Sequence, residues 1–196
     1  MLSNSCSRRP DCAGAPPGGR ASTLAWLAGC LLGVTLAASP CHAASWRDEL
    51  PRAEALGEGE LRWLGFRIYH ATLWSEQRPF QPERPFALQL RYYRTISRQR
   101  LVQTSLDEMR RLNGDAIDAA ALAQWELSLS RAFTDVADGD ELIGVYAPGH
   151  GMRFYNRQHL LADIADVRLA RAFFGIWLDE HTRDQHLRRK LLGGAP

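Results

Sequence analysis

The stretch FALQLRYYRTISRQRLVQTSLDEM, residues 86–109, changes from strand periodicity to helix periodicity. Its first part alternates apolar residues with others, which is typical of a strand with one buried face. The alternating apolar residues are Phe86, Leu88, Leu90 and Tyr92. After Ser97, which is a favoured helix N-cap, Leu101, Met109 and Leu112 recur at helical spacing. The stretch therefore predicts a sheet strand followed by a helix.

Further strands are predicted on both sides of this stretch. Residues 60–74 are rich in β-branched and aromatic residues and predict one long extended run. Residues 75–85 hold three prolines and predict a loop. Downstream, the turn signals at residues 138–140 and 148–151 predict a β-hairpin that ends in MRFY, residues 152–155.

Three more helices complete the predicted order of elements. Residues 118–133 carry an apolar stripe at helical spacing. Asp166 is the expected cap of residues 167–180, and Thr182 with Gln185 predicts a capping box for residues 183–192, which Gly193 ends. The aromatic residues of AFFGIWL, residues 172–178, predict the helix at the centre of the core. This order favours an α+β fold in which helices pack on an antiparallel sheet.

The first 43 residues predict a secretory signal peptide. Arginines precede an uncharged apolar run, residues 23–38, and small residues follow it. Cleavage after Ala43 fits this pattern, and cleavage after Ala44 fits it nearly as well. Lipidation at Cys30 stays open, because LAGC at residues 27–30 resembles a lipoprotein cleavage box. We expect a mature domain of residues 44–196 in the periplasm or outside the cell.

Cysteines and charge exclude several classes of site in the mature domain. Its predicted range contains no cysteine, which excludes a thiol nucleophile, a disulfide and a cysteine metal site. The four cysteines are all in the leader: Cys6, Cys12, Cys30 and Cys41. The net charge of +2 comes from three arginines and one aspartate of the leader. The balanced remainder predicts no nucleic-acid partner, and no apolar run in it predicts a membrane span.

Four motifs together resemble the chalcone isomerase-like superfamily, in particular its secreted bacterial branch. They are GEGELRWLGFRIYHATLW, the opening stretch above, FTDVADGDELIGVYAPGHGMRFY and AFFGIWLDEHTRDQHLRRKLLG. The resemblance implies an open-faced β-sandwich, a large antiparallel sheet covered by helices, with a ligand cleft between the two layers. The superfamily contains enzymes that cyclise a chalcone and also fatty-acid binders without enzymatic activity, so the fold does not decide the function.

The resemblance implies roles for particular positions. Tyr69 matches a strand residue that is threonine in the enzymes and tyrosine in the fatty-acid binders. The upstream arginine of the enzymes would fall near Leu56–Gly57, where this chain has no arginine, although Arg52 and Arg62 flank the position. The tyrosine at the helix head matches Leu101. Both departures count against cyclisation chemistry, and whether the protein is an enzyme stays open.

The candidate ligand-binding residues are Tyr69, Arg67, Arg62 and Arg91. Tyr69 would donate or accept a hydrogen bond, and by strand alternation Arg67 is expected on the same face. An arginine in the cleft would suit a carboxylate, although surface ion pairing is the simpler reading of each arginine. The expected partner is a small apolar acidic molecule such as a fatty acid.

No metal site and no cofactor are expected. His181 and His186 are five residues apart and span a predicted turn, so they do not share a helix face. Two other functions remain open. One is an isomerase, or intramolecular lyase, with a different catalytic set, which predicts a perturbed pKa beside Tyr69. The other is an envelope interaction module whose cleft is filled by its own side chains.

Overall fold

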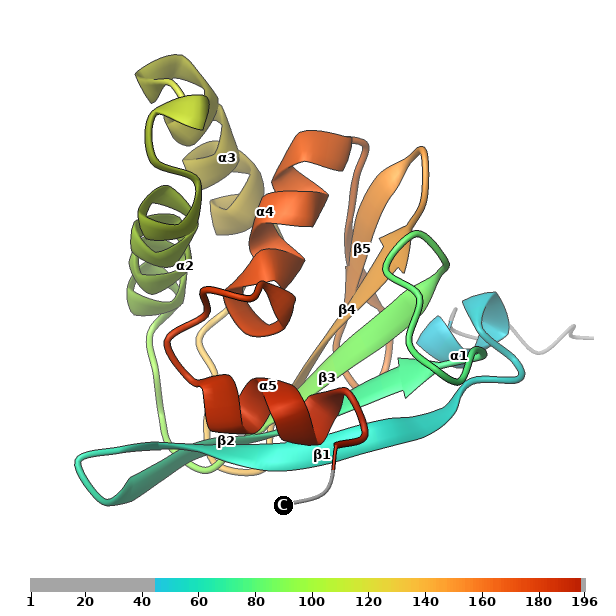
Figure 1. Cartoon of the computed structure of the whole chain (residues 1–196). Coiled ribbons are helices and arrows are strands. Elements are labelled where there is room, and N and C mark those ends of the chain that lie inside the picture. Colours follow the sequence, from blue (N-terminus) through green and yellow to red (C-terminus); the bar gives the residue numbers. More distant parts are fainter. Residues whose placement is uncertain (1–44, 195–196) are drawn as a thin grey trace, which may run out of the picture. The chain divides into compact units, whose positions relative to one another are not determined.

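The sheet has six antiparallel strands in sequence order, β1-β2-β3-β4-β5-β6. The computed structural model describes residues 45–194, so the predicted signal peptide, its cleavage point and the four cysteines lie outside the described residues. The strands are β1 (Glu54–Trp63), β2 (Phe66–Ser75), β3 (Phe86–Tyr92), β4 (Glu141–Ala147), β5 (Gly151–Tyr155) and β6 (Leu160–Ile164). Each strand pairs with its neighbour along the chain, and Figure 1 labels β1 to β5 in this sheet.

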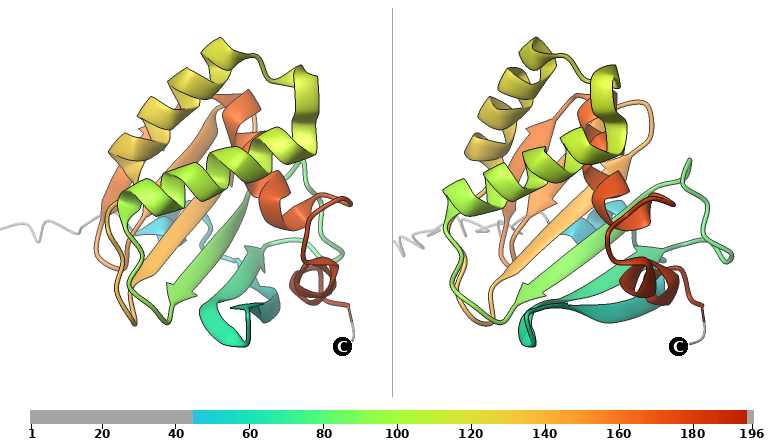
Figure 2. Two further views of the ribbon diagram at one scale, coloured as in Figure 1. Left: turned by 90° about the vertical axis from the view of Figure 1, so that its left-hand side faces the viewer. Right: turned by 60° about the vertical axis from the view of Figure 1, so that its left-hand side comes forward.

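Helices cover one face of this sheet, and a short helix covers part of the other. The first group is α2 (Arg98–Asn113), α3 (Ala119–Ala132), α4 (Val167–Leu178) and α5 (Gln185–Leu191), with a 3-10 turn, η1 (Gly114–Ala116), after α2. The short helix α1 (Trp46–Glu49) lies on the opposite face (Figure 2). Its Trp46 clusters there with Ile143, Val145 and Tyr155. The predicted α+β fold, an open antiparallel sheet covered by helices, is confirmed. Within residues 45–194, none of the helices has both the length and the apolar character to cross a bilayer.

Two of the predicted helix caps are confirmed. The Ser97 side chain accepts a hydrogen bond from the Arg100 amide at the start of α2, and Asp166 accepts one from the Leu169 amide at the start of α4. Each bond satisfies an amide that has no partner within the helix. The predicted capping box of Thr182 and Gln185 is wrong: Asp184 caps α5, and the Thr182 hydroxyl instead donates to the Ile176 carbonyl.

The single extended run predicted for residues 60–74 is also wrong. The chain reverses at Leu64 and Gly65, which both have positive φ angles of 49° and 83°, and β1 pairs with β2 as a hairpin. Asparagine and aspartate are the usual residues before glycine in such two-residue turns. A leucine in the left-handed region is rare, so residue type did not predict this turn.

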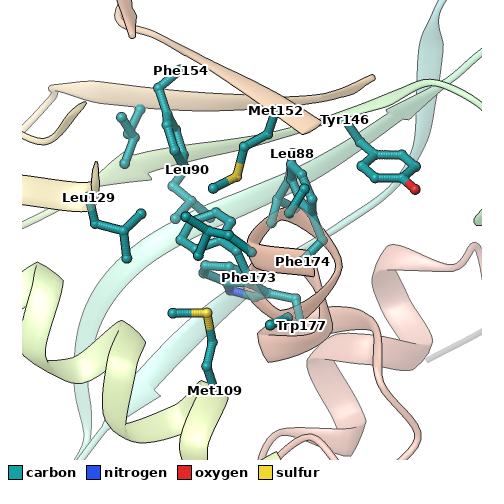
Figure 3. Close-up of a cluster of buried hydrophobic side chains, with 14 of the residues drawn as sticks. Leu88, Leu90, Met109, Leu129, Tyr146, Met152, Phe154, Phe173, Phe174 and Trp177 are labelled. Carbon is teal, nitrogen blue, oxygen red and sulfur yellow. The ribbon is translucent and has the colours of Figure 1, made fainter. Parts of the chain in front are cut away.

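An aromatic cluster fills the space between α4 and the sheet, as Figure 3 shows. Phe173 lies at its centre, and its ring centroid is 5.1–6.1 Å from those of Phe133, Phe154, Phe174 and Trp177. These five side chains are all at least 92% buried, and burial of each stabilises the fold by about 1.5–3 kcal/mol. The prediction that residues 172–178 form the centre of the core is confirmed.

Candidate functional site

Tyr69 lies on β2 and faces the helical layer. Its hydroxyl accepts a hydrogen bond of 2.8 Å from Nε1 of Trp177 on α4, and its ring meets that of Tyr92 edge-on at 5.8 Å. Strand alternation places Ala71 and Leu73, both completely buried, on the same face of β2. The phenol therefore presents one polar group to an otherwise apolar interior.

Arg67 does not share this face, so the prediction that strand alternation places it on the face of Tyr69 is wrong. Leu61 pairs with Tyr69, but the next pair is Arg62 with Arg67, so β2 has one extra residue, Ile68, at this point. Such a β-bulge shifts the alternation by one and turns the following side chains to the opposite face. Arg67 accordingly lies on the face of Glu60, away from the helices.

The three candidate arginines all lie away from Tyr69. Arg62 and Arg67 both pair with Glu60, at 2.8 Å and 3.4 Å, and more than half of each side chain is exposed. Arg91 lies opposite His70 on β2 and Glu141 on β4 in the strand register, and it is exposed. None therefore lies beside the Tyr69 hydroxyl as an anion partner, and a ligand-binding role for them stays a prediction.

Burial governs the chemistry of the two tyrosines. It raises the pKa of Tyr69 far above the ordinary value, and the hydrogen bond from Trp177 only partly offsets this. The carboxylates of Asp184 and Glu108 raise the pKa further. Burial also raises the pKa of Tyr92. Both phenols therefore stay protonated at neutral pH and are hydrogen-bonding groups rather than bases.

The enzymes' upstream arginine would fall near Leu56–Gly57, and at Gly57 there is no room for a side chain. Gly57 lies on β1 beneath the end of α5, and a Cβ added there would be 1.9 Å from the Lys190 carbonyl oxygen. At the helix-head position, Leu101 is partly buried and packs against the core. Neither position can supply the polar group that the resemblance implies for catalysis.

The core against which Tyr69 packs is filled by the protein's own side chains. Met109, Leu73 and Phe173 are each at least 97% buried. Figure 3 shows Trp177 among these core side chains, and its indole N–H contacts the Tyr69 hydroxyl. Two hollows with defined linings lie elsewhere. One of about 610 Å³ lies between α3 and residues 162–168, and one of about 130 Å³ lies beside residues 133–142 and 156–158. Neither includes Tyr69 in its lining.

Sequence reasoning missed the roles of Trp177 and Glu108. Trp177 was assigned to core packing, and its indole N–H was the only signal that it needs a polar partner. Glu108 was not singled out, although it is a carboxylate next to Met109 on the buried side of α2. Residue 177 is 108 positions from Tyr69, so only the folded chain shows that they meet.

Glu108 holds α2 to the segment before α5 and makes stability depend on pH. It is 91% buried and accepts hydrogen bonds from Arg111 and Arg183, at 2.6–2.9 Å. Burial alone would raise its pKa, but the two arginines outweigh burial and hold the pKa below the ordinary value of 4.5. A lowered pKa stabilises the fold above pH 4.5, and this contribution is lost as the pH falls through the folded-state pKa.

We expect Glu108→Gln to lower the free energy of unfolding at pH 7 by about 1–3 kcal/mol, because charge-assisted hydrogen bonds are lost. The difference from wild type should shrink below about pH 4, as the wild-type carboxylate becomes protonated. Urea unfolding at several pH values measures both the loss of stability at pH 7 and its decrease at low pH. Glu83→Gln is the control, since Glu83 is 77% exposed and forms only a 3.6 Å pair with Arg171. An equal loss at pH 3 and pH 7 would contradict this assignment.

The fold and the partly buried phenol of Tyr69 together define a class of protein, an open antiparallel sheet covered by helices with a polar group held between the layers. The chain belongs to the chalcone isomerase-like family, whose model matches residues 62–193. Among solved structures, it is similar to a fatty-acid binding protein from Arabidopsis thaliana, at 12% identity and a TM-score of 0.56. The match covers 72% of this chain and 87% of that one, and shows a shared fold. A comparison with curated protein sequences gave no match.

Proposed function

We propose that this protein binds a small apolar molecule with one polar head group, such as a fatty acid, without turning it over, in the periplasm. The observation that carries the proposal is the Tyr69 hydroxyl. It accepts a hydrogen bond from Trp177 within an apolar interior, and among residues 45–194 no hydrogen bond uses its own proton. That proton is available to a ligand oxygen. The fatty-acid binding protein of similar fold supports this proposal.

The electrostatics around Tyr69 specify the kind of head group. The charges that act on the hydroxyl come from Asp184 and Glu108, and the candidate arginines lie on the other face of the sheet. Asp184 disfavours a carboxylate anion beside the hydroxyl, whereas the charge of Glu108 is compensated by Arg111 and Arg183. The site therefore favours a neutral oxygen acceptor or a protonated acid over an ionised one.

The direction of the pKa shifts disfavours an isomerase. A general acid or base works best with a pKa near the operating pH. The pKa values of Tyr69 and Tyr92 are both raised away from neutrality, and the pKa of Glu108 is lowered away from it. In each of these three groups the shift takes the pKa further from pH 7, which is the wrong direction for proton transfer at that pH.

One observation favours a second function, an envelope interaction module without a ligand. The side chains between α4 and the sheet already fill the interior (Figure 3). A ligand must therefore displace Trp177 or separate helices from the sheet. Such displacement has a measurable signature, because tryptophan fluorescence should change on binding.

The deciding experiment is native mass spectrometry of protein purified from the periplasm, followed by extraction of the bound molecule. A binder should retain an apolar ligand, and added fatty acids should raise its melting temperature. We expect Tyr69→Phe to weaken binding about tenfold, which corresponds to one lost hydrogen bond. Tyr93→Phe is the matched control, because the Tyr93 hydroxyl donates to Glu60 on the opposite face.

Two results would contradict the proposal. An empty protein whose melting temperature fatty acids do not change would leave the interaction module as the better function. Equal binding by the wild type and Tyr69→Phe would show that the ligand lies elsewhere. Recovery of the protein from the cytoplasm with its leader uncleaved would contradict the periplasmic location.

A further inference from the structure

The tip of the β1–β2 hairpin exposes three large apolar side chains. Trp63 is 65% exposed, Leu64 82% and Phe66 58%. They are consecutive apart from Gly65 in the turn, and we call residues 63–66 the hairpin tip. Contiguous exposed apolar groups mark interaction sites more often than scattered ones do.

The hairpin tip projects beyond the body of the sheet (Figure 1). Pairing of β2 with β3 begins at Tyr69 and Tyr92, so Phe66 and Arg67 pair only with β1. Within the described part of the chain, residues 45–194, no strand pairs with the tip on the β3 side. All three apolar side chains can therefore reach an external surface together.

The backbone conformation at the tip is energetically unfavourable for Leu64, the leucine that adopts it. Leu64 has a φ angle of 49° and is the single residue other than glycine with a positive φ among residues 45–194. Asparagine would adopt this conformation more readily. A strained and exposed leucine contributes nothing to the core, and strain of this kind is concentrated at functional sites.

Arginines surround the hairpin tip. The guanidinium of Arg94 lies 4.6 Å from the centre of the Phe66 ring, and Arg62 and Arg67 flank the turn. Glu60 is the carboxylate that pairs with both Arg62 and Arg67. Three arginines and one glutamate leave this end of the hairpin positively charged, although the predicted mature domain as a whole is balanced.

We propose that the hairpin tip docks the protein on the surface of an anionic phospholipid bilayer. Tryptophan is enriched at membrane interfaces, where its ring lies at the head-group level, and exposed leucine and phenylalanine enter the acyl boundary. Arginines near the surface are each worth about 1 kcal/mol of attraction to anionic lipid. This surface is independent of what Tyr69 binds, since the tip extends away from the interior.

Flotation with vesicles tests the proposal with the whole purified protein. We expect binding to vesicles of phosphatidylglycerol and phosphatidylcholine, and weaker binding to pure phosphatidylcholine. Leu64→Asn should weaken binding about tenfold, as one leucine leaves the acyl boundary. It should also raise the melting temperature, because asparagine relieves the turn. Arg94→Gln should weaken binding about fivefold on anionic vesicles and have little effect on neutral ones.

Leu127→Ser is the matched control, because Leu127 is 59% exposed on α3, away from the hairpin. It should leave vesicle binding unchanged. Three outcomes would overturn the proposal. The first is unchanged vesicle binding by Leu64→Asn, which would assign binding to another segment such as the leader. The second is an equal loss of vesicle binding in Leu127→Ser. The third is a wild-type dimer that the Leu64→Asn substitution dissociates. The last result would show that the tip contacts a second copy of the chain.

Discussion

Replacing Gly57 with alanine should destabilise the protein by about 3 kcal/mol or more, or displace α5 from the sheet. The added Cβ would lie 1.9 Å from the Lys190 carbonyl oxygen and 2.6 Å from that of Leu191. Both are backbone atoms at the end of α5, so no side-chain rotation can relieve the overlap. The backbone of α5 must therefore move away from β1, which weakens the packing between these two elements.

Gly175→Ala on α4 is the matched control for this effect. Its nearest neighbour beyond its own helix would be the Asp179 Cβ, at 3.9 Å, which is ordinary contact. Because alanine is the better helix former, this variant should be stabilised by about 0.5–1 kcal/mol. Chemical denaturation measures the free energy of unfolding of both variants, which should fall in Gly57→Ala and rise in Gly175→Ala. A Gly57→Ala protein as stable as wild type would show that α5 does not lie against β1.

The result also bears on catalysis. The enzymes that the chain resembles would carry an arginine near this position, and here α5 covers it. A variant with a longer side chain at residue 57 should therefore fail to fold correctly rather than gain activity. The departure from the enzymes is a consequence of how α5 packs, beyond the change of one residue.

Truncating Phe173 to alanine should destabilise the protein by about 3–5 kcal/mol. Phe173 is 97% buried and contacts four other aromatic side chains. Its loss leaves a cavity between α4 and the sheet that rigid neighbours fill only in part. Leu127→Ala on the exposed side of α3 should change the stability by less than about 0.5 kcal/mol. Urea unfolding of the two variants provides the comparison.

Phe173→Ala also distinguishes the two proposed functions. If the protein binds an apolar ligand between the layers, a fatty acid should restore much of the lost stability by filling the cavity. If the interior is only a packed core with no route for a ligand, fatty acids should leave the melting temperature of this variant unchanged. A loss of stability below about 1 kcal/mol would contradict the central role of Phe173.

Local signals in the sequence predicted the elements that short-range physics determines. The alternation in residues 86–92 and the caps at Ser97 and Asp166 depend on neighbours within four residues, and all three were confirmed. The turn at Leu64 failed because its left-handed leucine contradicts the usual preference. The Thr182 cap failed because α5 begins only at Gln185, where Asp184 is the cap and accepts from the Leu187 amide.

In the candidate site, too, some placements followed from the sequence and others only from the folded structure. Tyr69 was chosen by its resemblance to a family position, and the structure places it facing the helices. Arg67 was placed by counting residues along an ideal strand, and one inserted residue at Ile68 reversed its face. Its actual partners, Glu60 and the Tyr93 ring, are on the other side of the sheet.

By itself the sequence determined the fold class, the periodicity of most elements and the aromatic core helix, because these follow from patterns repeated over short distances. Only the tertiary structure decided that Trp177 meets Tyr69, that α5 covers Gly57 and that arginines gather around an exposed apolar turn. Those contacts join residues far apart in the chain, and their geometry depends on a single bulge and on how closely two backbones approach.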